Sequence, residues 1–326
     1  MDFNKAFNER PVLITGARGF MGSYLAVRLA KAGARLSLLL RPGKQDHHPG
    51  RPDLPAGAAC MEADIRDKAS IDDLITRVSP SVIIHLAAFT DVRRDPRLRN
   101  RCFEHNLTGA LNVAEAAMRR KVDRMVQLGT CEEYGDHQAP FTEDLPPRPV
   151  SPYSESKAEA TQSLLALHKK EGLPVVILRP FLAYGPGQHP DRFLNQAIHA
   201  ALRGERLRMT PGEQTREFNH VEDLVEGIMI AAAAEGVDGE IINLASCDER
   251  KLLDVVKMIY RFAGSDLQPD TQALAYRAGE AMRFCGSVEK CRRLLDFRPR
   301  ITLENGVQKL MEWERSRMNR KGRHHA

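Results

Sequence analysis

The chain has 326 residues, 42% of them hydrophobic, and a formal net charge of +5, which indicates a globular protein larger than one average domain. No apolar run reaches the ~18 residues of a membrane span, and residues 1–10 are too polar for a signal peptide. Positive charge gathers at residues 315–325 without interleaved aromatic residues, so a nucleic-acid partner is not expected. We therefore expect a cytoplasmic protein that binds neither membranes nor nucleic acid.

Six cysteines are scattered along the sequence without the Cys-x-x-Cys spacing of a metal site or the pattern of a disulfide framework. Reduced thiols are therefore expected, and no metal is expected. The six are Cys60, Cys102, Cys131, Cys247, Cys285 and Cys291.

The first predicted element is a strand over residues 11–15, which leads into a glycine-rich turn and then a helix over residues 23–32. Gly16 permits a tight turn, Gly19 lets a pyrophosphate approach the backbone, and Gly22 lets helix and strand pack closely. The amides at the helix N-terminus then face the phosphate. This segment predicts a dinucleotide-binding site.

Further strands are predicted at residues 36–40, 58–61, 81–85, 124–128 and 174–178, and helical stretches separate most of them. Such alternation predicts an α/β fold with a Rossmann-like, doubly wound parallel sheet. Residues 41–57 contain four prolines and three glycines and are expected to form a mobile surface loop.

The chain beyond Arg179 is expected to contain a helix over residues 191–203, a short hairpin over residues 207–218, a helix over residues 221–234 and a strand over residues 240–244. The last strand is expected to return to the main sheet. The dinucleotide-binding domain is thus predicted to comprise residues 1–180 together with residues 219–245. A smaller C-terminal α/β substrate cap is predicted at residues 181–218 and 246–326.

Tyr153 and Lys157 lie four positions apart, the spacing that places two side chains on one face of a helix. A free tyrosine titrates near pH ~10, so it is a poor base at neutral pH unless a nearby positive charge favours the phenolate. Lys157 can supply that charge. The pair suits a proton shuttle in an alcohol/ketone interconversion that accompanies hydride transfer.

These motifs and several further segments resemble the extended short-chain dehydrogenase/reductase family, in particular its nucleotide-sugar epimerase/dehydratase/4-ketoreductase branch. The resemblance covers most of the chain. It rests on residues 16–22, 64–67 (Asp-Ile-Arg-Asp), 85–88 (His-Leu-Ala-Ala), Asn106, Gly109 and Asn112, residues 129–135 (Gly-Thr-Cys-Glu-Glu-Tyr-Gly), 153–157, 179–187, 216–223 and 288–299, and Trp313.

For the cofactor, the resemblance implies that Asp64 and Ile65 flank the adenine ring and that Ala87 and Ala88 line the cofactor channel. The other cofactor-binding positions that it implies are Gly16, Arg18, Gly19, Phe20, Met21, Gly22, Leu86, Tyr153, Lys157 and Pro180.

The end of the second strand bears on the choice of cofactor. Relatives that use NAD usually have an acid there, which binds the ribose hydroxyls, whereas this chain has Leu40 followed by Arg41. Arg41, with Lys44, can form charge-assisted bonds to a 2′-phosphate. NADP is therefore favoured over NAD, and the alternative is that Arg41 is an ordinary surface arginine.

Thr130 falls where the family has a Ser or Thr that hydrogen-bonds the reacting oxygen, so the implied catalytic residues are Tyr153, Lys157, Thr130 and Glu132. Sugar 4,6-dehydratases of the family have an acid/base pair after this threonine, but here Cys131 replaces the Asp or Ser beside the carboxylate. A thiol is a weaker hydrogen-bond partner. An NDP-4-keto-6-deoxyhexose reductase acting at carbon 4 is therefore favoured, with a 4,6-dehydratase, a 4-epimerase with recycled cofactor, or a non-catalytic NADP-sensing module as alternatives.

Arginines are expected to bind the diphosphate of a nucleotide-diphosphate sugar, because guanidinium groups suit phosphate oxygens. The family pattern implies Arg216, with Arg277 or Arg283 assisting, while Thr130 and Cys131 are expected to contact the substrate. A homodimer is also expected, because residues 99–119 and 151–171 resemble the helices through which relatives pair as a four-helix bundle. The sequence specifies neither the sugar nor the base.

Overall fold

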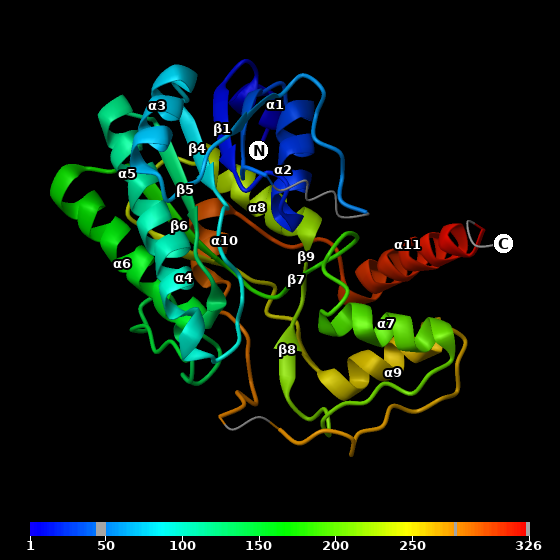
Figure 1. Ribbon diagram of the computed structural model, residues 1–326. Coiled ribbons are helices and arrows are strands. Elements are labelled where there is room, and N and C mark those ends of the chain that lie inside the picture. The colour runs from blue at the N-terminus through cyan, green and yellow to red at the C-terminus, as the bar shows by residue number, and fades with distance from the viewer. Residues whose placement is uncertain (44–49, 277–278, 324–326) are drawn as a thin grey trace.

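A seven-stranded parallel sheet forms the centre of the computed structural model, which describes residues 1–43, 50–276 and 279–323 (Figure 1). The strand order β10-β6-β5-β4-β1-β2-β3 confirms the predicted doubly wound sheet, including the late return of a strand near residue 240. The strands are β1 (Pro11–Thr15), β2 (Arg35–Leu40), β3 (Ala59–Glu62), β4 (Val82–His85), β5 (Arg124–Leu128), β6 (Val175–Pro180) and β10 (Ile241–Leu244).

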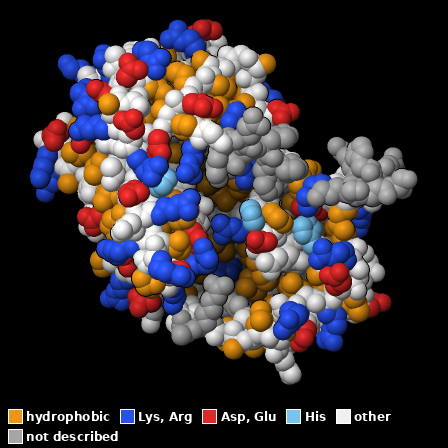
Figure 2. Space-filling view, viewed as in Figure 1, with side chains coloured by type: hydrophobic (Ala, Val, Ile, Leu, Met, Phe, Trp, Pro, Cys, Tyr) orange, Lys and Arg blue, Asp and Glu red, His pale blue; other side chains and the backbone are white. Residues whose placement is uncertain are grey.

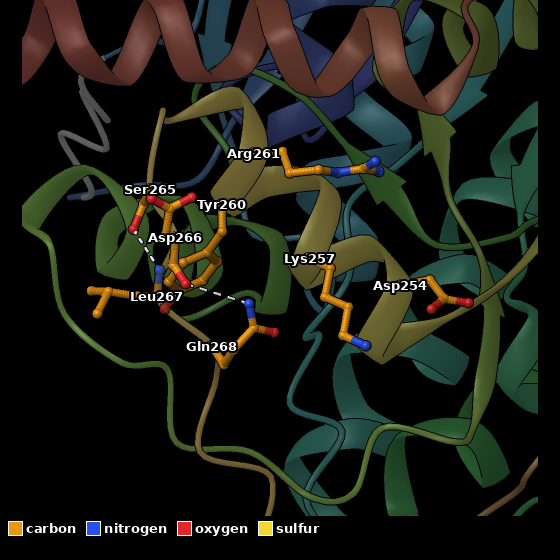
Figure 3. A pocket seen from close by; sticks show the side chains of 8 residues that line it. All are labelled: Asp254, Lys257, Tyr260, Arg261, Ser265, Asp266, Leu267 and Gln268. Carbon is orange, nitrogen blue, oxygen red and sulfur yellow. Dashed lines mark hydrogen bonds between the residues drawn. The ribbon is translucent and has the colours of Figure 1, made fainter.

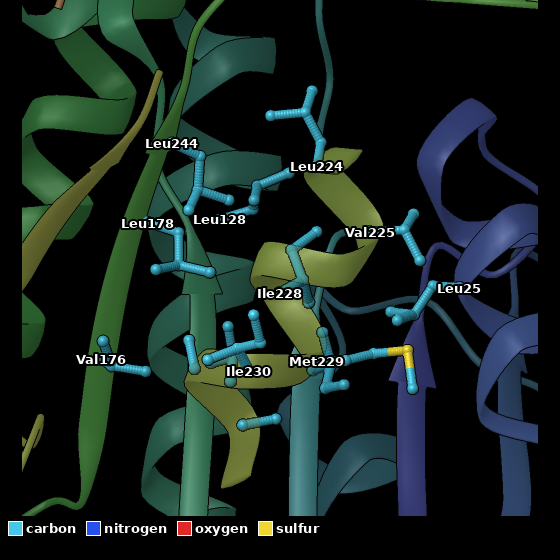
Figure 4. Close-up of a cluster of buried hydrophobic side chains, with 14 of the residues drawn as sticks. Leu25, Leu128, Val176, Leu178, Leu224, Val225, Ile228, Met229, Ile230 and Leu244 are labelled. Carbon is cyan, nitrogen blue, oxygen red and sulfur yellow. The ribbon is translucent and has the colours of Figure 1, made fainter. Parts of the chain in front are cut away.

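Helices cover both faces of this sheet, and each face has its own hydrophobic cluster. One face is covered by α1 (Phe3–Phe7), α2 (Phe20–Lys31), α8 (Val221–Ala233) and α10 (Glu289–Leu295), and the other by α3 (Lys68–Val78), α5 (Gly109–Arg120) and α6 (Pro152–Glu171). Figure 4 shows α8 over the strands, with Val225 and Met229 directed toward Leu25 of the neighbouring α2. Burial on both faces explains why the strands are nearly continuous apolar runs.

The ends of the helices follow from local sequence. Asp67 caps α3 by accepting hydrogen bonds from the amides of Ala69 and Ser70. Ser151 caps α6, Pro152 occupies its first turn, and Gly172 ends it in the left-handed conformation. The N-terminal cap therefore fixes the start of α6, and with it the first-turn positions of Tyr153 and, one turn later, Lys157.

The cap contains α7 (Phe193–Arg203), α9 (Leu252–Phe262) and α11 (Leu303–Arg323), whose apolar faces meet in a third hydrophobic cluster. The expected hairpin over residues 207–218 is wrong. Instead, β8 (Thr215–Glu217) pairs antiparallel with β11 (Glu249–Lys251), and β7 (Ala183–Tyr184) pairs with β9 (Asn219–His220). The preceding backbone is bonded elsewhere, since the Leu207 amide donates to Tyr260 and the Met209 amide to the Asp270 carbonyl.

Within the predicted loop of residues 41–57, residues 50–52 and Leu54 are partly buried against the rest of the protein, and residues 44–49 lie outside the described residues. Gly50 lies against the Trp313 ring, where a β-carbon would come within 1.8 Å of it. Arg51 donates to the carbonyls of Arg18 (2.8 Å) and Gly187 (3.2 Å). The loop therefore joins the glycine-rich turn to the cap.

The remaining elements are short helices: η1 (Pro96–Leu98), α4 (Arg99–Phe103), the π-helix η2 (Glu104–Thr108) and η3 (Cys131–Tyr134). The division of the chain into a dinucleotide-binding domain and a substrate cap stays a prediction. No helix within the described ranges is long and apolar enough to cross a membrane.

Candidate active site

The glycine-rich turn lies at the carboxyl ends of β1 and β4, the neighbouring strands at which the strand order reverses. Ligands of open α/β sheets bind at such a point. Gly16 has a φ of +71°, and a β-carbon there would lie 2.8 Å from the Ala87 nitrogen. At Gly22 it would lie 2.2 Å from the Gly16 oxygen. Gly19 caps α2 without a side-chain hydrogen bond, so the bare backbone fits a pyrophosphate.

The end of β4 is fixed to the end of β1 by hydrogen bonds. The Thr15 hydroxyl bonds His85 Nδ1 at 2.8 Å and accepts from the Ala87 amide at 3.1 Å. Burial, and then the charge of Lys157, lower the pKa of His85 to about 3, so this ring is neutral. These bonds hold the Leu86-Ala87-Ala88 segment beside the glycine-rich turn, where Phe20 and Met21 are also partly buried.

The predicted adenine positions lie beyond this turn. Arg66 hydrogen-bonds the Asp64 carboxylate at 2.7 Å and lowers the pKa of Asp64 to about 2. Ile65 packs against Gly109, where a β-carbon would come within 2.6 Å of its side chain. Arg41 is exposed, and its charge contributes to a lowered pKa of His105. Pro180 ends β6 at the same edge of the sheet.

Thr130, Tyr153 and Lys157 are brought together at the carboxyl end of β5. Tyr153 shares a side-chain hydrogen bond with Thr130, and the Lys157 ammonium donates to the Leu128 carbonyl. Burial raises the pKa of Tyr153 and lowers that of Lys157 to about 8. The phenol is thus hydrogen-bonded to a hydroxyl, and the ammonium is anchored at the carbonyl two residues before Thr130; these are the types of group that proton transfer to a substrate oxygen requires.

Glu132 and Cys131 lie beside this group and differ in their chemistry. Glu132 is partly buried and its pKa is raised by burial, against the opposing charges of Arg216, Arg192 and Arg94. Cys131 is buried and its pKa is raised well above its usual value by burial. The Cys131 thiol is therefore neutral, which leaves the Glu132 carboxyl group as the candidate acid/base group of the two.

Of the two predicted diphosphate residues that the structure describes, Arg216 is the one whose charge acts on Glu132. It is paired with Glu280 and also donates to the carbonyls of Thr215 and Ala281, each at 2.8 Å. Arg283 is exposed and forms a bidentate pair with Glu249 (3.1 and 2.7 Å). Arg277 lies outside the described residues. Figure 2 shows a hollow between the sheet and the cap with Lys and Arg side chains along its edge.

Sequence reasoning missed a buried ion pair beneath the site. Glu133 accepts a hydrogen bond from the Thr130 amide at 2.8 Å and pairs with Arg179 at 2.8 Å. The available signal was an arginine that ends a buried strand together with a second glutamate after Thr130. Neither charge is tolerated in a core without a partner.

Arg94 and Arg192 were also missed. Arg94 donates to the Gly279 carbonyl at 3.3 Å, across from the sheet to the cap. Its signal was a run of five arginines within residues 93–101. Arg192 precedes α7 and had no comparable signal.

Other parts of the molecule offer less chemistry. No group of three His, Cys, Asp or Glu side chains in the described part of the chain could hold a metal ion. A depression of about 500 Å³ lies on α9, where Lys257, Arg261 and Asp266 line it (Figure 3). Its Ser265 and Gln268 side chains bond the local backbone, and it is remote from Tyr153.

Several known proteins are similar to this chain over nearly its whole length. UDP-N-acetyl-alpha-D-glucosaminuronate decarboxylase of Bacillus cytotoxicus is 30% identical over 322 residues, covering 94% of this chain and 98% of that protein. The UDP-glucose 4-epimerase of Thermotoga maritima, solved with UDP-glucose, has a TM-score of 0.85 at 25% identity and covers 94% and 99% of the two chains. DesIV, a dTDP-glucose 4,6-dehydratase of Streptomyces venezuelae solved with NAD, has a TM-score of 0.81 at 27% identity over 94% and 98%.

A family model matches residues 12–245, which run from β1 to just beyond β10 and include the glycine-rich turn and the Thr130, Tyr153 and Lys157 group. The resemblance to extended short-chain dehydrogenases/reductases is thereby confirmed. The chain is an enzyme of the NAD dependent epimerase/dehydratase family.

Proposed function

We propose that this enzyme transfers hydride at carbon 4 of a nucleotide-diphosphate hexose, and that its reaction is the reduction of an NDP-4-keto-6-deoxyhexose. The observation that carries the proposal is the Thr130, Tyr153 and Lys157 group beside a neutral Cys131 thiol. Reduction needs one proton donor and its supporting charge, and this group supplies both. Three relatives that share the fold act on nucleotide sugars by their names.

Each residue of the group has a distinct task in the reduction. Bound dinucleotide supplies the hydride that the carbonyl carbon accepts. The Tyr153 hydroxyl gives its proton to the carbon 4 oxygen, which becomes the alcohol, and Lys157 stabilises the phenolate left behind. The Thr130 hydroxyl holds the same oxygen while negative charge develops on it.

Around the sugar, Glu132 is placed to accept a hydrogen bond from a hydroxyl, and Arg216 to bind the diphosphate. Arg216 is occupied by Glu280, so a diphosphate must displace that carboxylate. Arg94 and Arg192 add positive charge near Glu132. Together the three arginines favour a doubly charged diphosphate at this end of the site.

A 4,6-dehydratase, 4-epimerase or decarboxylase is the second candidate, and Glu132 is the observation that favours it. Its raised pKa and partial burial suit a carboxyl group that exchanges protons with a sugar carbon or a leaving hydroxyl. These reactions return the hydride to the substrate, so they recycle the cofactor.

For the cofactor we propose NADP over NAD, because Arg41 rather than an acid follows β2. DesIV was solved with NAD, so both dinucleotides need to be titrated side by side. Tighter binding of NADP, with the difference lost in Arg41→Ala, supports the proposal. Equal or tighter binding of NAD contradicts it.

The reductase proposal is tested by incubating the purified protein with NDP-4-keto-6-deoxyhexoses and NADPH or NADH while following absorbance at 340 nm. Stoichiometric loss of absorbance with formation of the alcohol supports a reductase. Sugar turnover without net change in absorbance supports the recycling reactions instead. Dinucleotide binding without turnover of any nucleotide sugar indicates a non-catalytic module.

A further inference from the structure

The buried pair of Glu133 and Arg179 lies directly beneath the proposed catalytic group. The exposed fraction of the side chain is 0% for Glu133 and 2% for Arg179. One carboxylate oxygen accepts from the Thr130 amide at 2.8 Å, and the other accepts from Arg179 at 2.8 and 3.1 Å. Both oxygens are therefore used, and the carboxylate is fixed in orientation.

The carboxylate also lies close to the backbone from which Lys157 is held. A β-carbon at Gly129 would come within 2.8 Å of the Glu133 oxygen, so this glycine is what lets the carboxylate approach the end of β5. The carbonyl of the preceding residue, Leu128, accepts the hydrogen bond from the Lys157 ammonium. Glu133 thus lies beside Gly129, the residue between Thr130 and Leu128, whose carbonyl holds Lys157.

We propose that Glu133 is a positioning residue for this site: it fixes the Thr130 backbone and places negative charge near the Lys157 ammonium. The inference rests on the proposed function, because it assigns Glu133 a task toward Thr130 and Lys157. Arg179 in turn holds Glu133 and stacks over the Tyr134 ring, with its guanidinium carbon 4.5 Å from the ring centre.

Among the described titratable groups near Lys157, Glu133 is the one that supplies a negative charge. His85 on β4 is neutral, since its pKa is about 3, and Tyr153 on the same helix is a neutral phenol with a raised pKa. Within the described residues, the one charge that acts on the pKa of Lys157 is the negative charge of Glu133, which raises it against the larger effect of burial.

The direct test is to titrate Lys157 by NMR of its side-chain ¹³Cε signal in the full-length protein without ligands, in wild type and in Glu133→Gln. Lys157→Met identifies the signal. Removing the negative charge is expected to move the Lys157 midpoint to lower pH. An unchanged or higher midpoint in a folded Glu133→Gln protein overturns the inference, because a merely structural carboxylate leaves the midpoint in place.

Two further variants keep the test decisive. Glu143→Gln is the matched control, since Glu143 is also partly buried and accepts a hydrogen bond from the Asn243 amide, but its charge does not act on Lys157. Its midpoint is expected to match wild type. If Glu133→Gln does not fold because Arg179 lacks its partner, the double variant Glu133→Gln/Arg179→Gln removes both charges and is expected to show the same downward shift.

Enzyme activity separates this inference from the proposed function. The pH profile of kcat/KM is expected to fall on its alkaline side as Lys157 loses its charge. In Glu133→Gln this alkaline fall is expected to move to lower pH, by the same number of pH units as the NMR midpoint of Lys157. A shifted NMR midpoint in a protein that acts on no nucleotide sugar supports the Glu133 role and refutes the proposed function. An active enzyme whose Glu133→Gln midpoint and alkaline fall both stay in place refutes the Glu133 role alone.

Discussion

Lys157 is a buried amine in the candidate active site, and in the proposed mechanism its state of protonation sets what Tyr153 can do. Its ammonium donates to the Leu128 carbonyl, while burial lowers its pKa to about 8. The charge is present below that pH and is lost as pH rises through it. A charged Lys157 favours the phenolate, and a neutral one does not.

We therefore expect kcat/KM to fall on the alkaline side of about pH 8. The measurement is a pH profile of kcat/KM, which reports groups of the free enzyme. Lys157→Arg keeps a positive charge to beyond pH ~12, so any activity that it retains is expected to lack this limb. A wild-type profile that stays flat to pH ~10, where a free lysine titrates, contradicts the assignment.

The proposed catalytic residues were easier to find in the sequence than the contacts that support them. Tyr153, Lys157 and Thr130 follow from local spacing and from motifs. The structure hydrogen-bonds Tyr153 to Thr130 and Lys157 to Leu128, and the catalytic roles stay predictions. The pairing of Glu133 with Arg179 joins residues 46 positions apart. No local period encodes such a contact, and only the rule that buried charges need partners points to it.

The glycine-rich turn and the N-terminus of α2 pack together, and we propose that they form one cofactor-binding element. Gly22 sits where a β-carbon would come within 2.2 Å of the Gly16 oxygen, which is backbone and cannot give way cheaply. The close packing of β1 and α2, and hence the direction of the helix amides, depends on this contact.

Gly22→Ala is expected to weaken dinucleotide binding at least about tenfold, equivalent to about 1.4 kcal/mol, because α2 must move away from the turn. Binding is measured by calorimetry or by fluorescence of the reduced cofactor. Gly57→Ala is the matched control, since nothing lies within 4 Å of a β-carbon there. Equal affinity in the two variants contradicts this role of the turn.

In the cap, Arg216 is held by the segment of residues 279–281 through Glu280 and the Ala281 carbonyl. Glu280→Gln removes the internal competitor for the guanidinium. We expect nucleoside diphosphate affinity to rise a few-fold, the factor that corresponds to about 0.5–1 kcal/mol for a partly exposed ion pair.

Calorimetric titration with nucleoside diphosphates measures this change. Glu213→Gln breaks the exposed pair with Lys251, which has no proposed role in binding, and is the control, with no expected effect on affinity. Weaker binding by Glu280→Gln shows instead that Glu280 orients Arg216 for the ligand.

Strands of the main sheet were predictable because buried parallel strands are apolar runs bounded by helices. The cap strands were not, because β8 and β11 are three residues each and pair across 30 intervening residues or more. The expected hairpin failed for this reason. The engagement of Arg216 by Glu280 is likewise a contact between distant segments.

In the whole molecule, α4, η2, α5 and α6 lie together on one side of the sheet. Phe103 and Leu111 are partly exposed there and belong to none of the three hydrophobic clusters. We propose that they contribute to the homodimer that the family resemblance implies. Two protomers would then pair as a four-helix bundle.

A dimer is expected in light scattering of the wild-type protein, and Leu111→Glu is expected to shift it toward monomer because it places a charge in an apolar interface. Arg120→Glu at the exposed end of α5 is a surface control for the added charge. A monomeric wild type, or a dimer unaffected by Leu111→Glu, contradicts this interface.

The most direct measurement of the central claim follows a hydrogen from cofactor to sugar. NADPH or NADH that carries deuterium at both positions of nicotinamide carbon 4 is supplied with an NDP-4-keto-6-deoxyhexose, and the product is analysed by mass spectrometry and NMR. The proposed reduction predicts one deuterium at carbon 4 of the sugar, and no product from Tyr153→Phe although that variant still binds cofactor. Product without deuterium at carbon 4, or full activity of Tyr153→Phe, would contradict it.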